Sequence, residues 1–361
     1  MARCRRTWAA AGTVALLSAA CDTPAHPPKA FVPTSVRFPA TVTIELSAES
    51  DAPLELKHFV QLSSDVLVAV ERKTDVVWRL PLRRGEAIGA IGSLRGQGRR
   101  TNVGLAALGG ALTSIDVTGR IAAFVTETAS WRDVTRRYAL RGSGLRSFIQ
   151  ASDGAWYLLE NHASVDPMTR LASDTLRVVR LDSTGSVRVE YAHPRASPDR
   201  LLGFMADLGS LTIVDDTLLL ASSSPPRVRR WALGATHATF ETLTGVPVRM
   251  VDSSDRQAIT RQLAAVGPAY ADAATAFDRY PPVYSARPVG RGLFVVATAG
   301  LSRFALDYYC RDSFVATLID HPAAVSIALV DEGAVVMRDD LERDRMLVEY
   351  YDYRRFGMVC R

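Results

Sequence analysis

Residues 59–91 read FVQLSSDVLVAVERKTDVVWRLPLRRGEAIGAI, and this stretch decides the fold class. It contains four short apolar runs, at 59–62, 65–70, 75–80 and 87–91, with polar or charged turn residues between them. Runs this short and rich in Val and Leu predict β-strands. Four strands within about 40 residues are typical of one blade of a β-propeller. The stretch therefore predicts a four-stranded sheet as the unit of the fold.

A related sequence pattern recurs along the chain. It consists of a short strand, a polar turn and a second strand. It stands at residues 115–121 (IDVTGRI), 149–156 (IQASDGAW) and 329–335 (LVDEGAV), and more weakly at 214–218 and 289–293. We expect its glycine to supply a positive φ in the tight turn between the first two strands of each sheet. With the turn at 63–65 there are six units, so the sequence predicts an all-β fold, a six-bladed β-propeller that fills residues 41–361 as one domain.

Two segments fall outside the repeat. Residues 41–46 form a spare strand before the first unit, whereas the last unit, 325–353, is one strand short. We expect the N-terminal strand to complete the final blade and close the ring, which removes the exposed sheet edges. Residues 252–280 contain Ile259, Leu263, Val266 and Tyr270 at helical spacing, with Asp252, Ser253 or Ser254 available as a cap. This pattern predicts a short helical insertion over one mouth of the ring.

The first twenty residues have the three parts of a bacterial secretory signal. Arg3, Arg5 and Arg6 precede an apolar run from Trp8 to Leu17. That run is shorter than the roughly 20 apolar residues that a membrane-spanning helix needs. We therefore expect residues 1–20 to be a removed signal peptide, which places the mature protein in the cell envelope, facing the periplasm or the exterior.

Residues 17–21, LSAAC, resemble the lipobox of bacterial lipoproteins, in which small residues precede a cysteine that receives a lipid. The resemblance implies lipidation at Cys21 and hence a membrane as partner. The lipobox usually has Leu where this chain has Ser18, and Ser18 and Ala20 also fit ordinary signal peptidase, which would release a soluble protein. Because four prolines lie between residues 22 and 33, we expect residues 21–40 to be an extended tether.

Charge and cysteine content indicate the class of partner and the state of the cysteines. Removal of the signal leaves 40 basic against 38 acidic residues, and this near-neutral balance argues against a nucleic-acid partner. Cys4 leaves with the signal and Cys21 takes the lipid, so Cys310 and Cys360 are the remaining pair. In an oxidising compartment this pair predicts a disulfide, with two buried free thiols as the alternative.

Three stretches carry a family resemblance: IGAIG at 88–92 followed by RGQG at 95–98, the insertion leading into YPPVY at 280–284, and the turn-glycine pattern. Together they resemble the NHL-like and TolB-like six-bladed β-propeller lipoproteins, whose functions are largely unassigned. Members of that family usually continue Gly-Gln-Gly with Pro-Gly-Glu and place Trp after the turn glycine. Here Arg99 follows the first stretch, and Trp156 is the single Trp at the second. The resemblance implies the six-bladed fold.

The sequence contains no common catalytic motif, neither Gly-x-Ser-x-Gly, His-Glu-x-x-His, Cys-x-x-Cys, a P-loop nor Ser-x-x-Lys. We accordingly predict no catalytic residue, metal ligand or cofactor, and the ligand-binding residues stay unknown. The strand end Glu160-Asn161-His162 is the best polar candidate, although a polar loop edge is the simpler interpretation. The basic loop 95–100 is a weaker candidate for anion binding. The tyrosines at 308–309 and 350–353 are expected to pack between blades rather than to form a ligand platform.

Two functional classes are consistent with these observations. The first is a non-catalytic binding or scaffold module that holds a peptide, a glycan or an envelope protein on its loop face, near the insertion. The second is a metal-dependent hydrolase or lactonase with a cation in the central channel, which would require carboxylates such as Asp207, Asp216 and Glu160 to converge there. Because the sequence offers no activated nucleophile, the binding module is preferred.

Overall fold

The computed structural model describes residues 38–46, 56–71, 73–83, 85–94, 102–116, 119–125, 128, 130–134, 144–165, 172–194, 210–223, 226–233, 235, 238–264, 278–280, 283–300, 303–320, 324–340 and 345–360. The predicted signal peptide, Cys21 and the predicted tether up to residue 37 lie outside the described residues.

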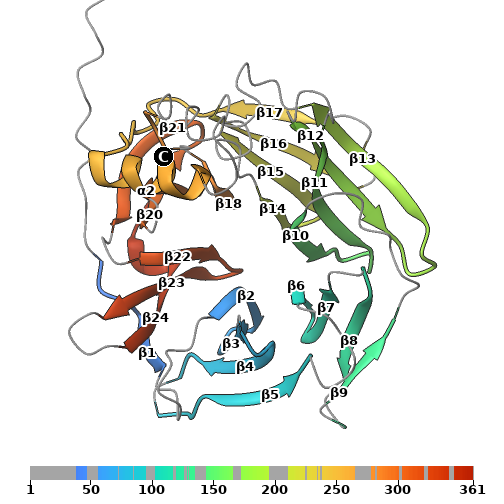
Figure 1. Cartoon of the computed structure of the whole chain (residues 1–361). Helices are drawn as coiled ribbons and strands as arrows, with labels where there is room; N and C mark the ends of the chain where they lie inside the picture. Colours follow the sequence, from blue (N-terminus) through green and yellow to red (C-terminus); the bar gives the residue numbers. More distant parts are fainter. Residues whose placement is uncertain are drawn as a thin grey trace, which may run out of the picture. The chain divides into compact units, whose positions relative to one another are not determined.

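The strands form six four-stranded antiparallel sheets that surround a common centre as the blades of a propeller (Figure 1). From the centre outward, blades 1 to 3 consist of β2 (Leu56–Ser63), β3 (Val66–Glu71), β4 (Val76–Pro81) and β5 (Gly89–Ser93); β6 (Asn102–Leu108), β7 (Ala111–Asp116), β8 (Ile121–Val125) and β9 (Ser130–Asp133); and β10 (Gly144–Gln150), β11 (Trp156–Val165), β12 (Ala172–Leu181) and β13 (Val187–Pro194). The predicted six-bladed fold is confirmed.

Blades 4 to 6 follow the same order. They consist of β14 (Leu211–Val214), β15 (Thr217–Ser223), β16 (Pro226–Ala232) and β17 (Thr239–Thr242); β18 (Ser285–Val289), β19 (Gly292–Gly300), β20 (Arg303–Cys310) and β21 (Ser313–Asp320); and β22 (Ala324–Leu329), β23 (Gly333–Asp340), β24 (Arg345–Asp352) and β1 (Val42–Leu46). The outermost strand of blade 6 is thus the N-terminal strand. It pairs antiparallel with β24, Val42 opposite Tyr350, so the predicted closure of the ring is confirmed.

The hydrophobic core is divided into six clusters, each of which fills the space between two neighbouring blades. The second strand of a blade contributes side chains to the two clusters on either side of it. In β3, Leu67 and Ala69 pack toward blade 6, whereas Val68 and Val70 pack toward blade 2. Because successive side chains point to opposite faces and both faces are buried, such a strand reads as a continuous apolar run.

The turns differ in part from the predicted pattern. Gly154 has φ 81° in the first hairpin of blade 3, as expected, but residues 115–121 join the second and third strands of blade 2. The first hairpin of that blade uses Gly109 and Gly110, with φ 56° and 82°. Asp215 and Asp216, with φ 46° and 57°, take the place of glycine in blade 4, since Asp tolerates this region better than most residues. A residue with positive φ, Gly or Asp, therefore forms this turn in blades 2 to 5, whereas the turns of blades 1 and 6 contain none.

The C-terminal segment is fastened to blade 5. After β24 the chain forms the 3-10 helix η3 (Tyr353–Phe356), whose start is capped by the Asp352 side chain. A disulfide then joins Cys360 to Cys310 at the end of β20, with their Cα atoms 5.1 Å apart. The pair expected from the sequence is the pair that the structure contains. No described helix is long and apolar enough to cross a membrane.

Candidate functional site

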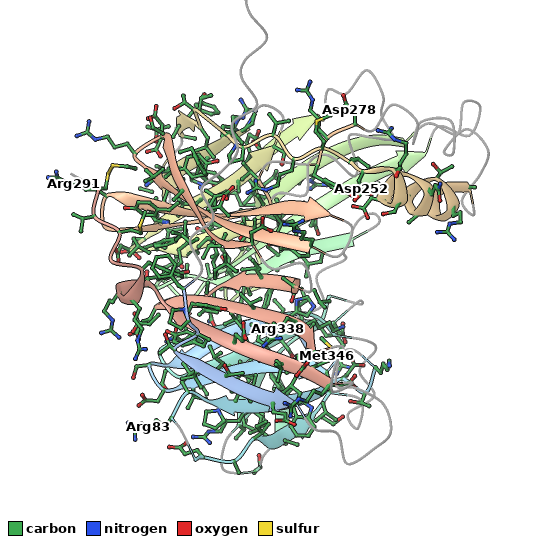
Figure 2. All side chains as sticks on the ribbon, turned by 90° about the vertical axis from the view of Figure 1, so that its left-hand side faces the viewer. Arg83, Asp252, Asp278, Arg291, Arg338 and Met346 are labelled. Atoms are coloured by element: carbon green, nitrogen blue, oxygen red, sulfur yellow. A yellow bond between two sulfur atoms is a disulfide. The ribbon has the colours of Figure 1, made fainter. Side chains whose placement is uncertain are left out.

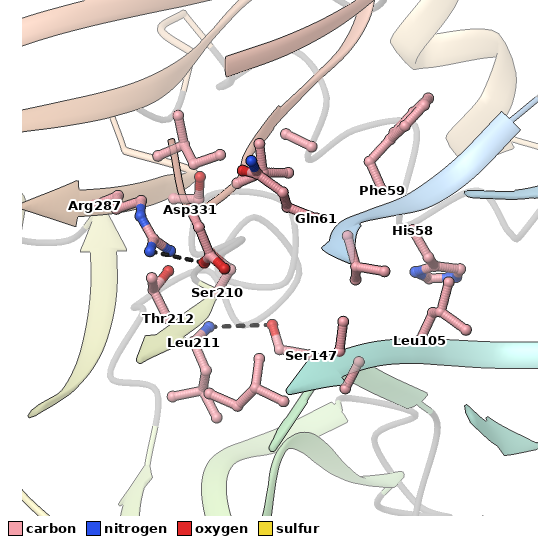
Figure 3. A pocket seen from close by; sticks show the side chains of 18 of the residues that line it. His58, Phe59, Gln61, Leu105, Ser147, Ser210, Leu211, Thr212, Arg287 and Asp331 are labelled. Carbon is pink, nitrogen blue, oxygen red and sulfur yellow. Dashed lines mark hydrogen bonds and ion pairs between the residues drawn. The ribbon is translucent and has the colours of Figure 1, made fainter. Parts of the chain in front are cut away.

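A cavity of 1370 Å³ lies at the centre of the ring, lined by residues of all six innermost strands (Figure 3). We call it the central channel. Much of its wall is apolar: Phe59, Leu105, Ile149, Leu211, Tyr284, Phe304 and Ile327. Polar residues also line it, among them His58, Gln61, Ser147, Ser210, Arg287 and Asp331. This composition is typical of a binding site in which apolar surface supplies affinity and a few polar groups fix orientation.

The two ends of the central channel lie on different faces of the ring. Each blade has four antiparallel strands, so every innermost strand begins on the face where the chain enters the blade. We call this the insertion face, because it carries Asp252 at the start of the insertion and also Met346 (Figure 2). The first hairpin of each blade lies on the opposite face, marked by Arg291 in Figure 2, which we call the turn face.

His58 lies near the insertion-face end, at an irregularity of β2. Lys57 pairs with Val70 and Val60 with Val68, so residues 58 and 59 together stand opposite a single residue. The extra residue is a β-bulge, and His58 has φ 54°, which is uncommon for a residue other than glycine. Burial, together with the charge of Lys57, lowers the pKa of His58 to about 4. The channel wall therefore holds a neutral imidazole in a strained backbone, as functional sites often do.

Two serines join the wall between blades 3 and 4. The Ser147 hydroxyl accepts a hydrogen bond of 3.1 Å from the Leu211 backbone N–H, which ties β10 to β14. The Ser210 hydroxyl is buried, and no described residue forms a hydrogen bond with it. Since a buried hydroxyl without a partner costs free energy, Ser210 is a candidate for contact with a ligand or a water.

At the turn-face end, hydrogen bonds and an ion pair connect neighbouring blades. The Arg287 guanidinium of blade 5 donates to the Asp331 carboxylate of blade 6 over 2.9 Å, and the Arg287 side chain is only 10% exposed. The backbone N–H of Glu332 donates to Gln61 of blade 1 over 2.9 Å, and Ser152 of blade 3 donates to Asp216 of blade 4. These polar links hold the turn-face end in a fixed geometry.

The insertion lies on the insertion face beside blade 5 (Figures 1 and 2). Its helix α2 (Ser253–Ala264) is preceded by Asp252, whose carboxylate accepts from the Asp255 N–H over 2.8 Å, so of the three candidate caps Asp252 is the one used. Val266 and Tyr270 lie outside the described residues. None of the described residues between 252 and 280 lines the central channel, whereas Tyr284, just after the insertion, does. The described part of the insertion thus stands beside the mouth rather than over it.

A buried ion pair anchors the segment that leads into α2. Arg249 donates to the carboxylate of Asp307 on β20 over 2.7 Å, and Thr317 of β21 donates to the same oxygen over 2.8 Å. Asp307 is fully buried, and this burial raises the pKa of its carboxyl group against the opposing effect of Arg249. The insertion is therefore held to blade 5 at its base.

The polar residues singled out in the sequence do not meet in one site. Glu160 is buried in β11 and does not line the central channel, Asp216 lines it at the turn face, and Asp207 lies outside the described residues. The side chains of Asn161 and His162 and the loop 95–100 also lie outside them. Within the described ranges, no group of three or more His, Cys, Asp or Glu side chains could hold a metal ion. The tyrosines are buried and pack between blades, as expected.

Sequence reasoning missed His58, Ser210 and the Arg287–Asp331 link. Arg287 and Asp331 are 44 residues apart, and the channel combines residues from six blades, so no local spacing marks it. The one local signal is at His58, where the polar pair Lys57-His58 interrupts the apolar start of β2.

No protein-family model matches the chain, and no curated protein matches it in sequence. Solved structures do resemble it. A Bacteroides fragilis protein that is predicted to be exported has 11% identity and a TM-score of 0.53, over 86% of this chain and 93% of that one. A gluconolactonase from Xanthomonas campestris has 13% identity and a TM-score of 0.48, over 86% and 89% of the two chains. A streptogramin B lyase has 9% identity and a TM-score of 0.45, over 86% and 98%.

Identities this low show the fold alone, and neither enzyme's activity transfers to this chain. The likeness to the Bacteroides protein, with a TM-score of 0.53, is likewise one of fold. The six four-stranded sheets around a common centre make this chain a six-bladed β-propeller protein.

Proposed function

We propose that this protein is a non-catalytic binding module of the bacterial cell envelope, held at a membrane by a lipid on Cys21. Its ligand, part of a peptide, a glycan or a partner protein, enters the insertion-face end of the central channel. The observation that carries the proposal is the channel itself, 1370 Å³ with a largely apolar wall. Pockets for single small molecules have about 300–1,000 Å³, so this volume favours a longer, chain-like ligand.

The difference between the two ends supports entry from the insertion face. The turn-face end is held by the Arg287–Asp331 and Ser152–Asp216 links. At the insertion-face end stand the half-buried Tyr284 and Phe304, whose rings are 5.7 Å apart, together with His58 and the Ser210 hydroxyl. Aromatic rings with a few polar groups provide contact area and orientation for a peptide or a sugar chain.

Site-specific photo-crosslinking in intact cells tests the proposal. Ser326 lies near the insertion-face start of β22, is half-buried and lines the central channel. The variant Ser326→p-benzoylphenylalanine should form a specific adduct on irradiation. Ser186, exposed in the turn between β12 and β13, is the matched control, and the same substitution there should form none.

Two results would count against the binding module. One is the absence of a channel adduct when the variant is folded and exported. The other is turnover of lactones or esters by the purified protein that is abolished by a chelator and by a substitution of a channel carboxylate. That outcome would establish the hydrolase instead.

A further inference from the structure

The outer strands of blades 3 and 4 hold an arginine between two aromatic rings. The guanidinium carbon of Arg229, on β16, lies 3.8 Å from the ring centre of Tyr191 on β13 and 4.4 Å from that of Phe240 on β17. We call these three residues the arginine clamp. It lies on the outer strands of the ring, and none of its members lines the central channel.

The positive charge of the clamp is not balanced by the described residues. Neither Arg229 nor its neighbour Arg227, whose guanidinium carbon is 5.4 Å from the Phe240 ring centre, forms an ion pair with any described carboxylate. Arg230, on the other face of the same strand, pairs with Glu241 over 2.8 Å. Burial and the charge of Arg227 both lower the pKa of Arg229, so this surface favours an incoming negative charge.

A neighbouring groove between blades 3 and 4 also contains arginines, but these are paired with carboxylates. Blades 3 and 4 also enclose a cavity of 420 Å³ toward the turn face, lined by Arg180, Arg188, Asp153 and Glu190 among others. There Arg180 pairs with Asp153 over 2.8 Å and Arg188 lies 3.5 Å from Glu190. The arginines of that groove are paired, whereas among the described residues no carboxylate pairs with Arg227 or Arg229.

Stacking prepares the Arg229 guanidinium for a carboxylate. Two rings fix the plane of the group through cation–π contacts and leave its N–H edge free to donate. A planar guanidinium that is already oriented forms bidentate hydrogen bonds with a carboxylate at a reduced entropic cost. Arg229 is half-buried and Phe240 is 52% exposed, so a partner can reach both.

An open sheet edge lies next to the clamp. β17 is the last strand of its sheet, and no described strand pairs with its outer side. An extended peptide can add to such an edge through backbone hydrogen bonds, and its alternate side chains then lie on the face that carries Phe240 and Arg229. A peptide therefore satisfies the backbone edge and the charge together, whereas an anionic sugar satisfies only the charge.

From this arrangement we infer that the arginine clamp and the edge of β17 form a second binding surface, which takes an extended acidic segment of a protein partner. A Glu or Asp side chain of the segment pairs with Arg229, while its backbone extends the sheet of blade 4.

Calorimetric titration with a defined probe tests the inference. The probe is an acetylated and amidated peptide of alternating Glu and Thr, and the reference peptide has Gln in place of Glu. Full-length wild-type protein should bind the Glu peptide at least tenfold more tightly than the Gln peptide. Arg229→Gln should lose at least tenfold, and so should Arg229→Lys, which keeps the charge but not the planar stack.

Controls separate binding from folding. Phe240→Ala removes an exposed side chain, so it should keep the fold and still lose affinity severalfold. Arg132→Gln, an exposed arginine on the outer strand of blade 2, should leave affinity unchanged. Equal affinity of wild type and Arg229→Gln, or of the Glu and Gln peptides, would overturn the inference. Binding of polygalacturonate with no binding of the Glu peptide would also overturn it and assign the clamp to a glycan.

Discussion

The ring of Tyr308 lies directly over Gly292, which starts the neighbouring strand of blade 5. A methyl group added at Gly292 would stand 2.3 Å from the tyrosine oxygen and 2.5 Å from the ring. Blade 6 repeats the arrangement, with Gly333 beneath the ring of Tyr350. The backbone of Gly333 is not in the left-handed region, which corrects the role expected for this turn glycine. Glycine is needed at both places because an aromatic ring fills the position of its side chain.

Gly292→Ala should therefore lower the free energy of unfolding by about 1–3 kcal/mol through overpacking. Gly89→Ala is the control, since Gly89 has no atom within 4 Å of the added methyl group and no positive φ. Urea unfolding measures both. If Gly292→Ala unfolded at the same urea concentration as wild type, the Tyr308 ring would have moved aside without loss of stability, contrary to the prediction.

The disulfide fastens the C-terminal segment to blade 5 and joins two cysteines with a sequence separation of 50. In the chain-entropy model a loop of this size contributes about 4 kcal/mol. Cys310→Ser combined with Cys360→Ser should lower Tm by about 6 °C. Calorimetry measures the shift, and peptide mapping without reductant should show the two cysteines linked in wild type. Alkylation of both as free thiols in protein from the envelope would contradict the bond.

The Arg249–Asp307 pair provides a third prediction. Arg249→Met leaves a fully buried carboxylate without its cation and should cost about 3–5 kcal/mol. Arg249→Met together with Asp307→Leu removes both charges and should regain most of that loss. A double-mutant cycle by chemical denaturation checks this. A double variant less stable than the single variant would contradict this, and would show that the Arg249 and Asp307 side chains stabilise the protein by packing rather than by the pairing of their charges.

His58 predicts a pH dependence of stability. Because its pKa falls from 6.5 to about 4 in the folded protein, the unfolded chain binds more protons between these values. The free energy of unfolding should therefore decrease as the pH is lowered through this window. His58→Gln should show a flatter dependence in denaturation curves measured on either side of it. Identical slopes in wild type and variant would mean that His58 titrates normally.

Lipidation is tested at Cys21. Cells supplied with a labelled fatty acid should incorporate it into the wild-type protein and not into Cys21→Ser. Labelling of both proteins, or of neither, would refute the anchor. The released form of Cys21→Ser would then also show whether ordinary signal peptidase cleaves this chain.

The repeat of short strands could be predicted from the sequence because the strands of most blades follow one another along the chain. Strands β2 to β5 form within 38 residues, and their apolar runs are continuous wherever both faces are buried, as in β3. The ring closure followed from counting strands, since blade 6 lacked one that the N-terminal segment could supply. The reason for the glycine at position 333 could not be predicted, because it depends on the ring of Tyr350 on the neighbouring strand β24.

The candidate site depends on contacts that no local pattern encodes. Arg287 meets Asp331 only because blades 5 and 6 are neighbours, and the bulge at His58 is visible only in the pairing of β2 with β3. The clamp likewise joins Tyr191 to Arg229 across two blades. A mixed polar and apolar strand predicts that a side chain is exposed or buried, but not which side chain it faces.

The pairing of β1 with β24 has a consequence for the order of synthesis. The first of the described strands to be synthesised, β1, pairs with Tyr350 and Met346, which are translated roughly 300 residues later. Until then blade 6 has one strand too few and β1 has no partner. A chain that stops before β24 can build several blades but cannot close the ring. Closure is the most non-local step, and it is expected to set the slowest folding rate of the molecule.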